Sequence, residues 1–132
     1  MRVLLIEDEP TTAKAIELML TTEGFNVYST DLGEEGLDLG KLYDYDIILL
    51  DLNLPDMSGT DILARIKAEG SPLRRTPVVV LTTTDDRQEI QRCYDLGCNV
   101  YITKPVNYES FAQAIRQLGL FLSVIQVPEI ED

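Results

Sequence analysis

DIILLDLNLPDMSG, residues 46–59, is the most informative stretch of this sequence. Its apolar run, residues 47–50, predicts a buried strand that ends abruptly on the carboxylate of Asp51. Turn and helix-start residues follow directly. A buried strand that carries one acid to the edge of a sheet gains little stability, because burying a charge is costly. It does present that acid to a ligand or a phosphoryl donor, so we predict that Asp51 is the reacting residue.

The pattern of an apolar run followed by a helical segment repeats along the chain. Further strands are predicted at residues 2–7, 25–29, 77–81 and 99–103, and helices at residues 11–23, 33–41, 58–69, 85–96 and 108–125. Unbroken runs of Val, Ile and Leu are typical of parallel strands that are covered on both faces. The sequence therefore predicts an α/β fold in which strands and helices alternate.

Local details of two predicted helices are also expected. Pro10 precedes the first helix, where its missing N–H would be unpaired in any case. Ser58 is a predicted N-cap for the helix at residues 58–69. The helix at residues 33–41 is expected to be weak, because Gly36 and Gly40 interrupt it.

Length and charge limit the classes of function. The chain has 132 residues, the size of one domain, and its 45% apolar content supports a core without metals or disulfides. The net charge of −12 is uneven: residues 1–60 hold 13 acids and 3 bases, whereas residues 61–132 hold 10 acids and 8 bases. An acidic chain repels a phosphate backbone, so we expect no direct binding of DNA or RNA.

Residue types and hydropathy give further expectations. No apolar run approaches a membrane span, and Met1 leads straight into a strand pattern, so neither a membrane segment nor a signal peptide is expected. The spacing of Cys93 and Cys98 fits neither a CxxC redox pair nor a zinc half-site, which favours reduced thiols in the cytoplasm. The sequence has no histidine, which excludes a histidine kinase, a histidine phosphotransfer protein, a Ser-His-Asp hydrolase and a histidine-ligated metal enzyme.

Polar residues follow four of the predicted strands. Parallel sheets bind ligands outside the carboxyl ends of their strands, so these residues should converge on one edge: Glu7, Asp8, Asp51, Thr82 and Lys104. Three carboxylates with only one lysine would leave an excess of negative charge, so the acids would repel one another unless a cation intervened. Hard oxygen ligands suit Mg²⁺. Asp51 could then attack a phosphoryl group to give an acyl phosphate, with Lys104 offsetting charge and Thr82 donating a hydrogen bond.

Four motifs together resemble the signature of the bacterial two-component response-regulator receiver domain. They are LLIEDE at residues 4–9, ILLDLNLPDMSG at residues 48–59, VVVLTTTD at residues 78–85 and YITKP at residues 101–105. The resemblance covers about residues 2–122. It implies a flavodoxin-like, doubly wound (βα)5 fold with strand order 2-1-3-4-5, a receiver domain at residues 1–126 and a short tail at residues 127–132.

The resemblance also implies a role for each matching residue. Asp51 would be the phosphoacceptor, Asp8 a direct Mg²⁺ ligand, Glu7 a ligand through water, and Asn53 a ligand through its backbone carbonyl. Thr82 and Tyr101 would form the switch, and Lys104 would be the lysine of the site, followed by a cis bond to Pro105. Mn²⁺ or Ca²⁺ would substitute for Mg²⁺. The domain would phosphorylate and slowly dephosphorylate only itself.

Two halves of the chain resemble different members of the family. Residues 1–61 resemble the receiver of the alphaproteobacterial cell-cycle master regulator, whereas residues from about 66 onward resemble stand-alone regulators associated with phytochrome kinases. This difference suggests a hybrid, natural or engineered, that is joined within residues 60–72.

Partner surfaces follow from the resemblance and from apolar patterns. A phosphohistidine on a kinase or phosphotransfer protein is the expected donor, docking on Glu9, Thr12, Ala15, Met19, Pro105 and Val106. The apolar stripe of the last helix is wider than one sheet face requires, so we expect a homodimer through the fourth helix, fifth strand and fifth helix, with contacts from Leu118, Phe121, Leu122 and Ile125.

Two alternatives come from other classes. A strand-end Asp-x-Asn followed by Thr and Lys on later strands also resembles phosphatases of the haloacid dehalogenase type, but those carry a second acid at the position of Asn53 and usually use the first strand. A receiver-like interaction module without phosphorylation would not need the complete residue set. A P-loop NTPase is excluded, because GxxxxGK[ST] is absent.

Overall fold

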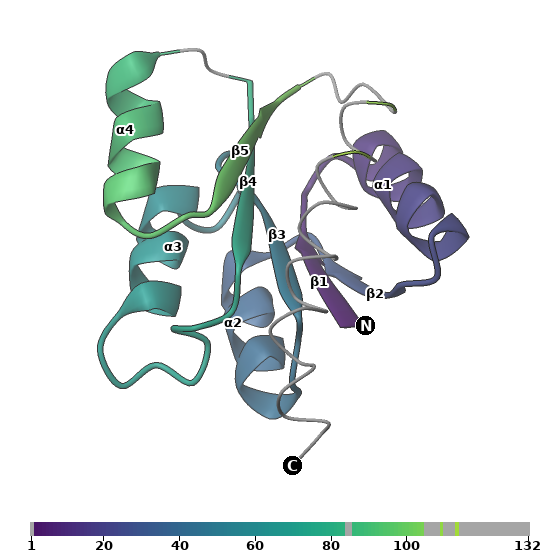
Figure 1. Ribbon diagram of the computed structural model, residues 1–132, viewed down its shortest axis with the longest axis horizontal. Helices are drawn as coiled ribbons and strands as arrows, with labels where there is room; N and C mark the ends of the chain where they lie inside the picture. Colours follow the sequence, from purple (N-terminus) through teal and green to yellow (C-terminus); the bar gives the residue numbers. More distant parts are fainter. Residues whose placement is uncertain (1, 84–85, 105–108, 110–112, 114–132) are drawn as a thin grey trace.

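The computed structural model describes residues 2–83, 86–104, 109 and 113, and its described part is a parallel sheet covered by helices (Figure 1). The strands are β1 (Arg2–Ile6), β2 (Asn26–Thr30), β3 (Ile47–Asp51), β4 (Val78–Thr82) and β5 (Val100–Thr103). The helices among these residues are α1 (Pro10–Thr22), α2 (Gly33–Leu42), α3 (Gly59–Lys67) and α4 (Arg87–Asp95).

The sheet has the predicted topology. All strand pairs are parallel, and the strand order is β2-β1-β3-β4-β5, which confirms the flavodoxin-like α/β prediction. β3 is the central strand, and all five of its residues are buried. The central position explains why the stretch around Asp51 reads as a continuous apolar run.

Two hydrophobic clusters cover the two faces of the sheet. The larger one joins side chains of α2, α3 and α4 to one face, and the other joins Ile16 and Leu20 of α1 to the opposite face. Figure 1 shows the same division, with α1 on one side of the sheet and α2, α3 and α4 on the other. Alternate residues of β1 and β3 point into each cluster, so the strands are buried on both faces.

Gly36 and Gly40 lower the helix propensity of α2, but they also allow the helix to lie close to the sheet. A Cβ on Gly36 would lie 2.5 Å from Ile6 Cδ1, and a Cβ on Gly40 would lie 2.4 Å from Leu73 Cδ1. Both positions are buried, so close packing offsets the low helix propensity of glycine. α2 forms over ten residues despite its unfavourable composition.

Several boundaries differ from the predictions. Asp51 and Thr82 are the last residues of their strands rather than the first residues beyond them. Ser58 is the N-cap residue of α3, as predicted, but its hydroxyl contacts the Thr60 hydroxyl at 2.7 Å and makes no capping bond. In α4, the described N-cap is Asp86, which accepts a hydrogen bond from Gln88 N.

Some predictions fall outside the described residues. These are the last helix at residues 108–125 with its dimer contacts, the tail, and the partner contacts Pro105 and Val106. Cys93 and Cys98 are both buried and both free. None of the described helices has the length and apolar character needed to cross a membrane.

Candidate functional site

Polar side chains from four strands meet at the carboxyl edge of the sheet, as predicted. Glu7 and Asp8 follow β1, Asp51 ends β3, Thr82 ends β4, and Lys104 follows β5. The register places Asp51 beside Leu81 and Thr82 beside Thr103, so the ends of β3, β4 and β5 lie within one residue of one another. The parallel topology alone therefore brings residues nearly one hundred positions apart into one site.

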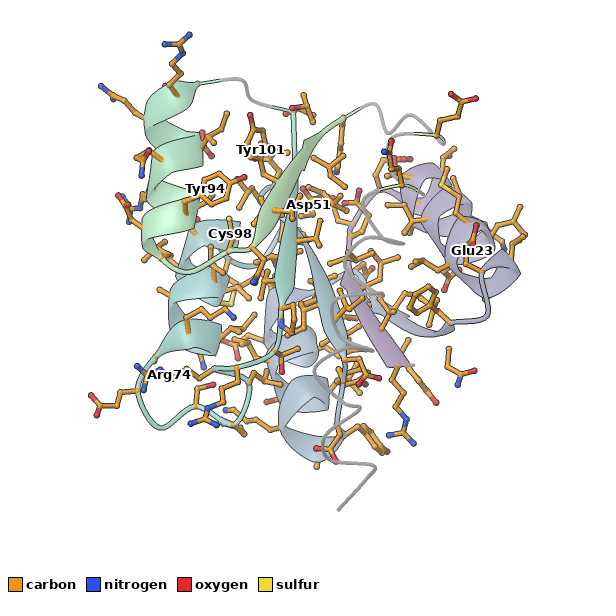
Figure 2. All side chains as sticks on the ribbon, viewed as in Figure 1. Glu23, Asp51, Arg74, Tyr94, Cys98 and Tyr101 are labelled. Atoms are coloured by element: carbon orange, nitrogen blue, oxygen red, sulfur yellow. The ribbon has the colours of Figure 1, made fainter. Side chains whose placement is uncertain are left out.

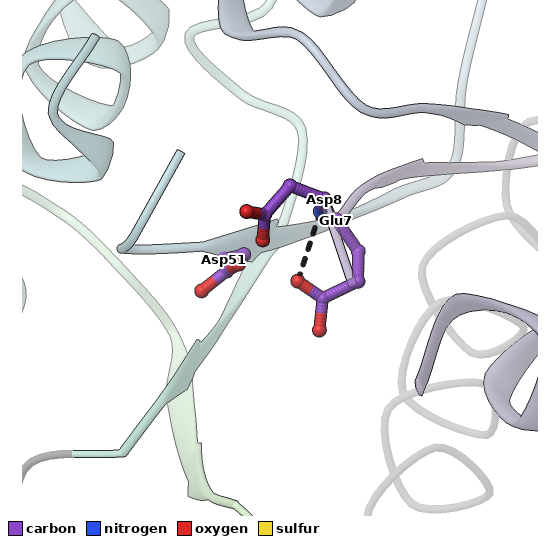
Figure 3. Close-up of side chains that lie close together, drawn as sticks. All are labelled: Glu7, Asp8 and Asp51. Carbon is purple, nitrogen blue, oxygen red and sulfur yellow. Dashed lines mark hydrogen bonds between the residues drawn. The ribbon is translucent and has the colours of Figure 1, made fainter. Parts of the chain in front are cut away.

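Three carboxylates form the centre of the site. One oxygen each of Glu7, Asp8 and Asp51 lies within 4.8 Å of the others (Figure 3). Glu7 and Asp51 are buried, at 3% and 1% exposure, whereas Asp8 is exposed. The backbone N–H of Asp8 donates to Glu7 Oε2 at 3.1 Å, which fixes the buried glutamate. The arrangement leaves Asp8 as the member of the cluster that faces solvent.

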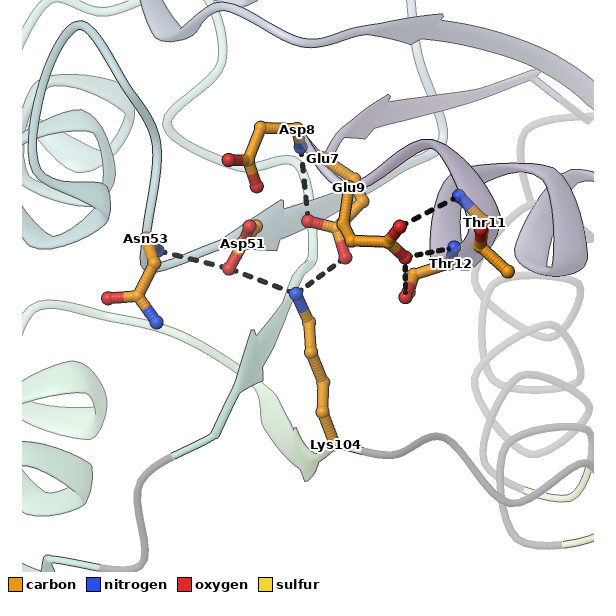
Figure 4. Close-up of polar contacts among 8 residues, drawn as sticks. All are labelled: Glu7, Asp8, Glu9, Thr11, Thr12, Asp51, Asn53 and Lys104. Carbon is orange, nitrogen blue, oxygen red and sulfur yellow. Dashed lines mark hydrogen bonds and ion pairs between the residues drawn. The ribbon is translucent and has the colours of Figure 1, made fainter.

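Lys104 is the cation of the site. Its Nζ lies 2.5 Å from Glu7 Oε1 and 3.2 Å from Asp51 Oδ1, so it bridges the two buried carboxylates (Figure 4). Its backbone N–H donates to the Thr82 carbonyl at 2.7 Å, which holds the residue beyond the end of β5. Burial opposes the charge of the lysine, but the hydrogen bond to Glu7 and the charges of Asp51 and Glu7 raise the pKa of Lys104.

The site carries more negative charge than Lys104 can offset. Burial, and next the contact with Glu7, raises the pKa of Asp51 to about 6, although the N–H of Asn53 acts in the opposite direction. Burial and the neighbouring Asp51 likewise raise the pKa of Asp8. A cluster of three carboxylates and one ammonium group is expected to raise the pKa of its acids in this way, because each carboxylate disfavours ionisation of its neighbours.

The two oxygens of Asp51 differ in their surroundings. Oδ1 accepts a hydrogen bond from Asn53 N at 3.0 Å and pairs with Lys104 (Figure 4). Oδ2 is buried and has no hydrogen-bond partner among the residues that the structure describes. A buried carboxylate oxygen without a partner, beside two further carboxylates, is a suitable ligand for a hard divalent cation. Mg²⁺ prefers such oxygen ligands, so these residues fit it.

Thr82 and Tyr101 lie on neighbouring strands. Thr82 is buried at the end of β4, the strand next to the one that ends on Asp51. Tyr101 is half-buried on β5, and its ring packs edge-to-face against Tyr94 of α4 with 5.8 Å between ring centroids (Figure 2). The aromatic contact links α4 to β5, the strand that carries the predicted switch residue Tyr101.

The expected partner residues on and before α1 divide into two groups. Thr12 and Ala15 are at least partly accessible, but Met19 packs partly against the cluster beneath α1. Glu9 has a structural task, because its carboxylate caps α1 by accepting from Thr11 N at 3.1 Å and Thr12 N at 2.6 Å (Figure 4). The hydrogen bond from the Thr12 hydroxyl, and then these two backbone bonds, hold the pKa of Glu9 below its usual range.

Sequence reasoning missed two features of this edge. An acid directly before Pro10 at a helix start is a cap signal, and it could have identified the role of Glu9. Asp56 accepts hydrogen bonds from Gly33 N at 2.8 Å and Glu34 N at 3.0 Å, across more than 20 residues of sequence. No local pattern indicates that second contact, because the packing of two separate loops creates it.

Comparisons with known proteins agree with the site. The family model for the response regulator receiver domain matches residues 3–116. The cell cycle transcriptional regulator CtrA of Caulobacter vibrioides is 48% identical over 135 residues, which cover 98% of this chain and 57% of CtrA. The chain thus spans a little over half the length of that relative.

Two solved structures extend the comparison. A response regulator receiver domain from Rhodospirillum rubrum is 50% identical, has a TM-score of 0.75, and is matched over 94% of each chain. The receiver domain of the sensor histidine kinase PA1611 from Pseudomonas aeruginosa, which holds a magnesium ion in its active site cleft, is 30% identical with a TM-score of 0.78. That match covers 92% of this chain and 97% of the other.

The comparisons give no support to a hybrid. The alignment with CtrA covers 98% of the chain, so it runs through residues 60–72, where a join was expected. One relative therefore accounts for both sides of the expected seam. Since the family model matches most of its length, the chain belongs to the response regulator receiver domain family, whose members accept a phosphoryl group and catalyse only their own phosphorylation and dephosphorylation.

Proposed function

We propose that Asp51 is the phosphoacceptor and that the donor is a phosphohistidine on a kinase or phosphotransfer protein. The observation that carries this proposal is the position of Asp51: it is buried, beside two acids, with one oxygen held by Lys104 and Asn53 and the other without a hydrogen-bond partner among the described residues. A structural acid in a core would be expected to have both oxygens satisfied.

The reaction forms one bond and breaks another. A carboxylate oxygen of Asp51 attacks phosphorus, the P–N bond of the donor breaks, and its electron pair returns to the imidazole nitrogen. Lys104 lies 3.2 Å from Asp51 Oδ1, where its charge can offset charge on the phosphoryl oxygens. Thr82, at the end of the next strand, is the proposed hydrogen-bond donor to one of those oxygens.

The proposed metal ligands are Asp8, Asp51 and the backbone carbonyl of Asn53, with Glu7 acting through water. When bound, Mg²⁺ would supply the positive charge that three carboxylates require, and Mn²⁺ or Ca²⁺ would fit the same hard oxygen set. Glu7 is buried and already pairs with Lys104, which supports an indirect role for it.

Transfer from a purified phosphohistidine donor tests the proposal. Label should move from the donor to the wild-type chain in the presence of Mg²⁺, and a chelator or the substitution Asp51→Asn should abolish the transfer. Lys104→Met should slow transfer, with a loss on the order of 100-fold, as is typical for removal of one charge-stabilising group. Transfer to Asp51→Asn at the wild-type rate would refute the assignment.

The donor is proposed to dock over α1 and the connection that follows Lys104. Exposed Ala15 and partly accessible Thr12 support this surface, which would extend to Glu9, Met19, Pro105 and Val106. Exchanging Thr12 and Ala15 for the residues of another receiver domain should change the preference among donors, measured as relative transfer rates. Unchanged preference would exclude this part of α1 from recognition.

A homodimer through α4, β5 and the last helix is the proposed assembly. It is supported by the apolar stripe at residues 118, 121, 122 and 125, and by the Tyr94–Tyr101 contact on that side of the sheet. Sedimentation before and after phosphorylation tests it, and a strictly monomeric protein in both states would contradict it. The domain is proposed to bind no nucleic acid itself, given its charge of −12, and to act in the cytoplasm, where its two free cysteines stay reduced.

A further inference from the structure

The side chain of Asp56 caps a helix to which it does not belong. Its Oδ1 accepts from Gly33 N at 2.8 Å and its Oδ2 accepts from Glu34 N at 3.0 Å, at the start of α2. The residue in the N-cap position of α2 itself is Leu32, which makes no side-chain cap. The first N–H groups of a helix need an outside acceptor, and the acid from the β3–α3 connection supplies it.

The same connection is tied to the phosphorylation site at its other end. Asn53, two residues after Asp51, donates its backbone N–H to Asp51 Oδ1 at 3.0 Å, and it pairs with Ser58 in an isolated antiparallel bridge. Gly59 N donates to the Leu52 carbonyl at 3.0 Å, which closes the loop at its base. Residues 53–58 therefore form a compact loop in which Asn53 contacts Asp51 and Asp56 contacts the start of α2.

The contact between this loop and α2 is close as well as polar. A Cβ on Gly33 would lie 2.7 Å from Met57 Cγ, so the start of α2 packs directly against the residue that follows Asp56. The amide donors of Glu34 and Gly33 hold the pKa of Asp56 below its usual range, so the charged form is the one that caps the helix. Asp56 is exposed, and it has no role in the core that would explain these bonds.

We propose that Asp56 is a positioning residue for phosphorylation: by anchoring the loop to α2, it holds the backbone of Asn53 against Asp51 and toward the bound cation. The inference rests on the proposed function, in which Asn53 contributes its carbonyl to the metal. Without the anchor, the loop keeps its internal bridge, its base and the bond from Asn53 N to Asp51, but it loses the two hydrogen bonds that tie it to the start of α2. The Asn53 backbone can then shift. A displacement of less than 1 Å matters, because metal and phosphoryl ligands need accurate placement.

The test compares three variants. Asp56→Ala removes the cap, Asp56→Asn keeps one acceptor oxygen, and Glu34→Gln removes one negative charge from the same turn of α2 while leaving the Asp56 bonds intact. Among the described residues, the Glu34 side chain pairs with Arg65 on the surface, at 3.1 Å, and both side chains are exposed, so its loss should cost little. Circular dichroism confirms that each variant is folded.

Two readouts follow the loop itself. The first is the Mg²⁺ affinity of the unphosphorylated protein, measured by amide NMR titration. The second is the rate of phosphorylation by acetyl phosphate as a function of Mg²⁺ concentration. Asp56→Ala should weaken Mg²⁺ binding roughly fivefold, a loss of the size expected when a helix cap is removed. Asp56→Asn should recover most of that loss, and Glu34→Gln should match the wild type.

Each contrary outcome has its own meaning. Equal Mg²⁺ affinity in Asp56→Ala and the wild type would overturn the positioning role while leaving the proposed function standing. Equal losses in Asp56→Ala and Glu34→Gln would also overturn it, since charge rather than the cap would then explain the effect. A wild-type chain that takes up no phosphoryl group would instead refute the proposed function itself.

Discussion

At the scale of single residues, Asp51 lies where its negative charge is costly. It is 1% exposed, and burial raises its pKa to about 6. The folded state therefore binds the proton more tightly than the unfolded state, so ionisation of Asp51 destabilises the metal-free fold at neutral pH. A reactive carboxylate is kept at the expense of stability, as is common at functional sites.

The substitution Asp51→Asn should stabilise the metal-free protein. The gain should be present at pH 7.5, on the order of 2 kcal/mol, because each pKa unit is worth about 1.4 kcal/mol and Asn also loses the pair with Lys104. The gain should shrink as pH falls through about 6 toward the ordinary value for an aspartate, since the wild-type acid is then neutral as well. Urea unfolding with a chelator at pH 7.5 and pH 4.5 measures both.

A matched control is Asp38→Asn, which removes an exposed acid on α2. Like Asp51→Asn, it removes one negative charge, but it does not touch the site, so its effect should be within about 0.5 kcal/mol at either pH. An Asp51→Asn variant that is less stable than the wild type at pH 7.5 would show that the acids of the site are already compensated without a metal.

At the scale of elements, the start of α3 is packed against the strand that carries Asp51. A Cβ on Gly59 would lie 2.3 Å from Leu52 Cα and 2.7 Å from the Asp51 carbonyl oxygen. Those atoms are backbone and cannot turn aside. Gly59→Ala should therefore lower the free energy of unfolding by about 2 kcal/mol, the usual cost of overpacking, and should also reduce phosphorylation by displacing β3.

The neighbouring Ser58→Ala is the control for Gly59→Ala. Ser58 is exposed and makes no capping bond, so its substitution should change the unfolding free energy by less than about 0.5 kcal/mol. Urea denaturation of the pair decides the matter. If Gly59→Ala were as stable as Ser58→Ala, then the close approach of α3 and β3 would not limit this position.

The α3–β4 connection depends on one basic side chain. Lys67 Nζ donates to the Arg74 carbonyl at 3.1 Å and the Thr76 carbonyl at 2.6 Å, and burial lowers the pKa of this lysine. Lys67→Met keeps the apolar stem but removes both bonds, which should cost on the order of 2 kcal/mol in thermal or urea unfolding. Arg65→Met on the same helix should cost far less, because its pair with Glu34 is exposed. Equal losses would show that the Lys67 bonds carry no special weight.

Elements were predictable from sequence where a single period or a single residue type decides them. Apolar runs located every described strand, and the strand ends located Glu7, Asp8, Asp51, Thr82 and Lys104 at one edge. The glycines of α2 predicted a weak helix, because the sequence does not show what packs against them. In the structure, the side chains of Ile6 and Leu73, from distant segments, occupy the space beside these glycines. The contact of Asp56 with α2 could not be predicted from the sequence for the same reason, since it joins two separate segments.

At the scale of the whole molecule, a cation that binds only the folded state must stabilise the entire domain. At about 100 times its dissociation constant, the gain is about 2.7 kcal/mol. Mg²⁺ should therefore raise the unfolding free energy of the wild type, whereas Asp8→Asn should show little response because Asp8 is a proposed ligand. Asp38→Asn should respond as the wild type does. An equal Mg²⁺ response in Asp8→Asn would remove Asp8 from the ligand set.

The topology joins these scales. A parallel sheet of order β2-β1-β3-β4-β5 places Asp51 at the centre of one edge, with the β1 acids on one side and Thr82 and Lys104 on the other. The fold thereby supplies both the reason for the raised pKa and the counter-charge that limits it. The position of each residue in the proposed site therefore depends on strands whose side chains pack in the two hydrophobic clusters.

The most direct test of Asp51 as phosphoacceptor is the intact mass of the chain after incubation with acetyl phosphate and Mg²⁺. The wild type should gain the mass of one phosphoryl group, and Asp51→Asn, treated in the same way, should gain none. A wild type without added mass, or an equal gain on both proteins, would contradict the account.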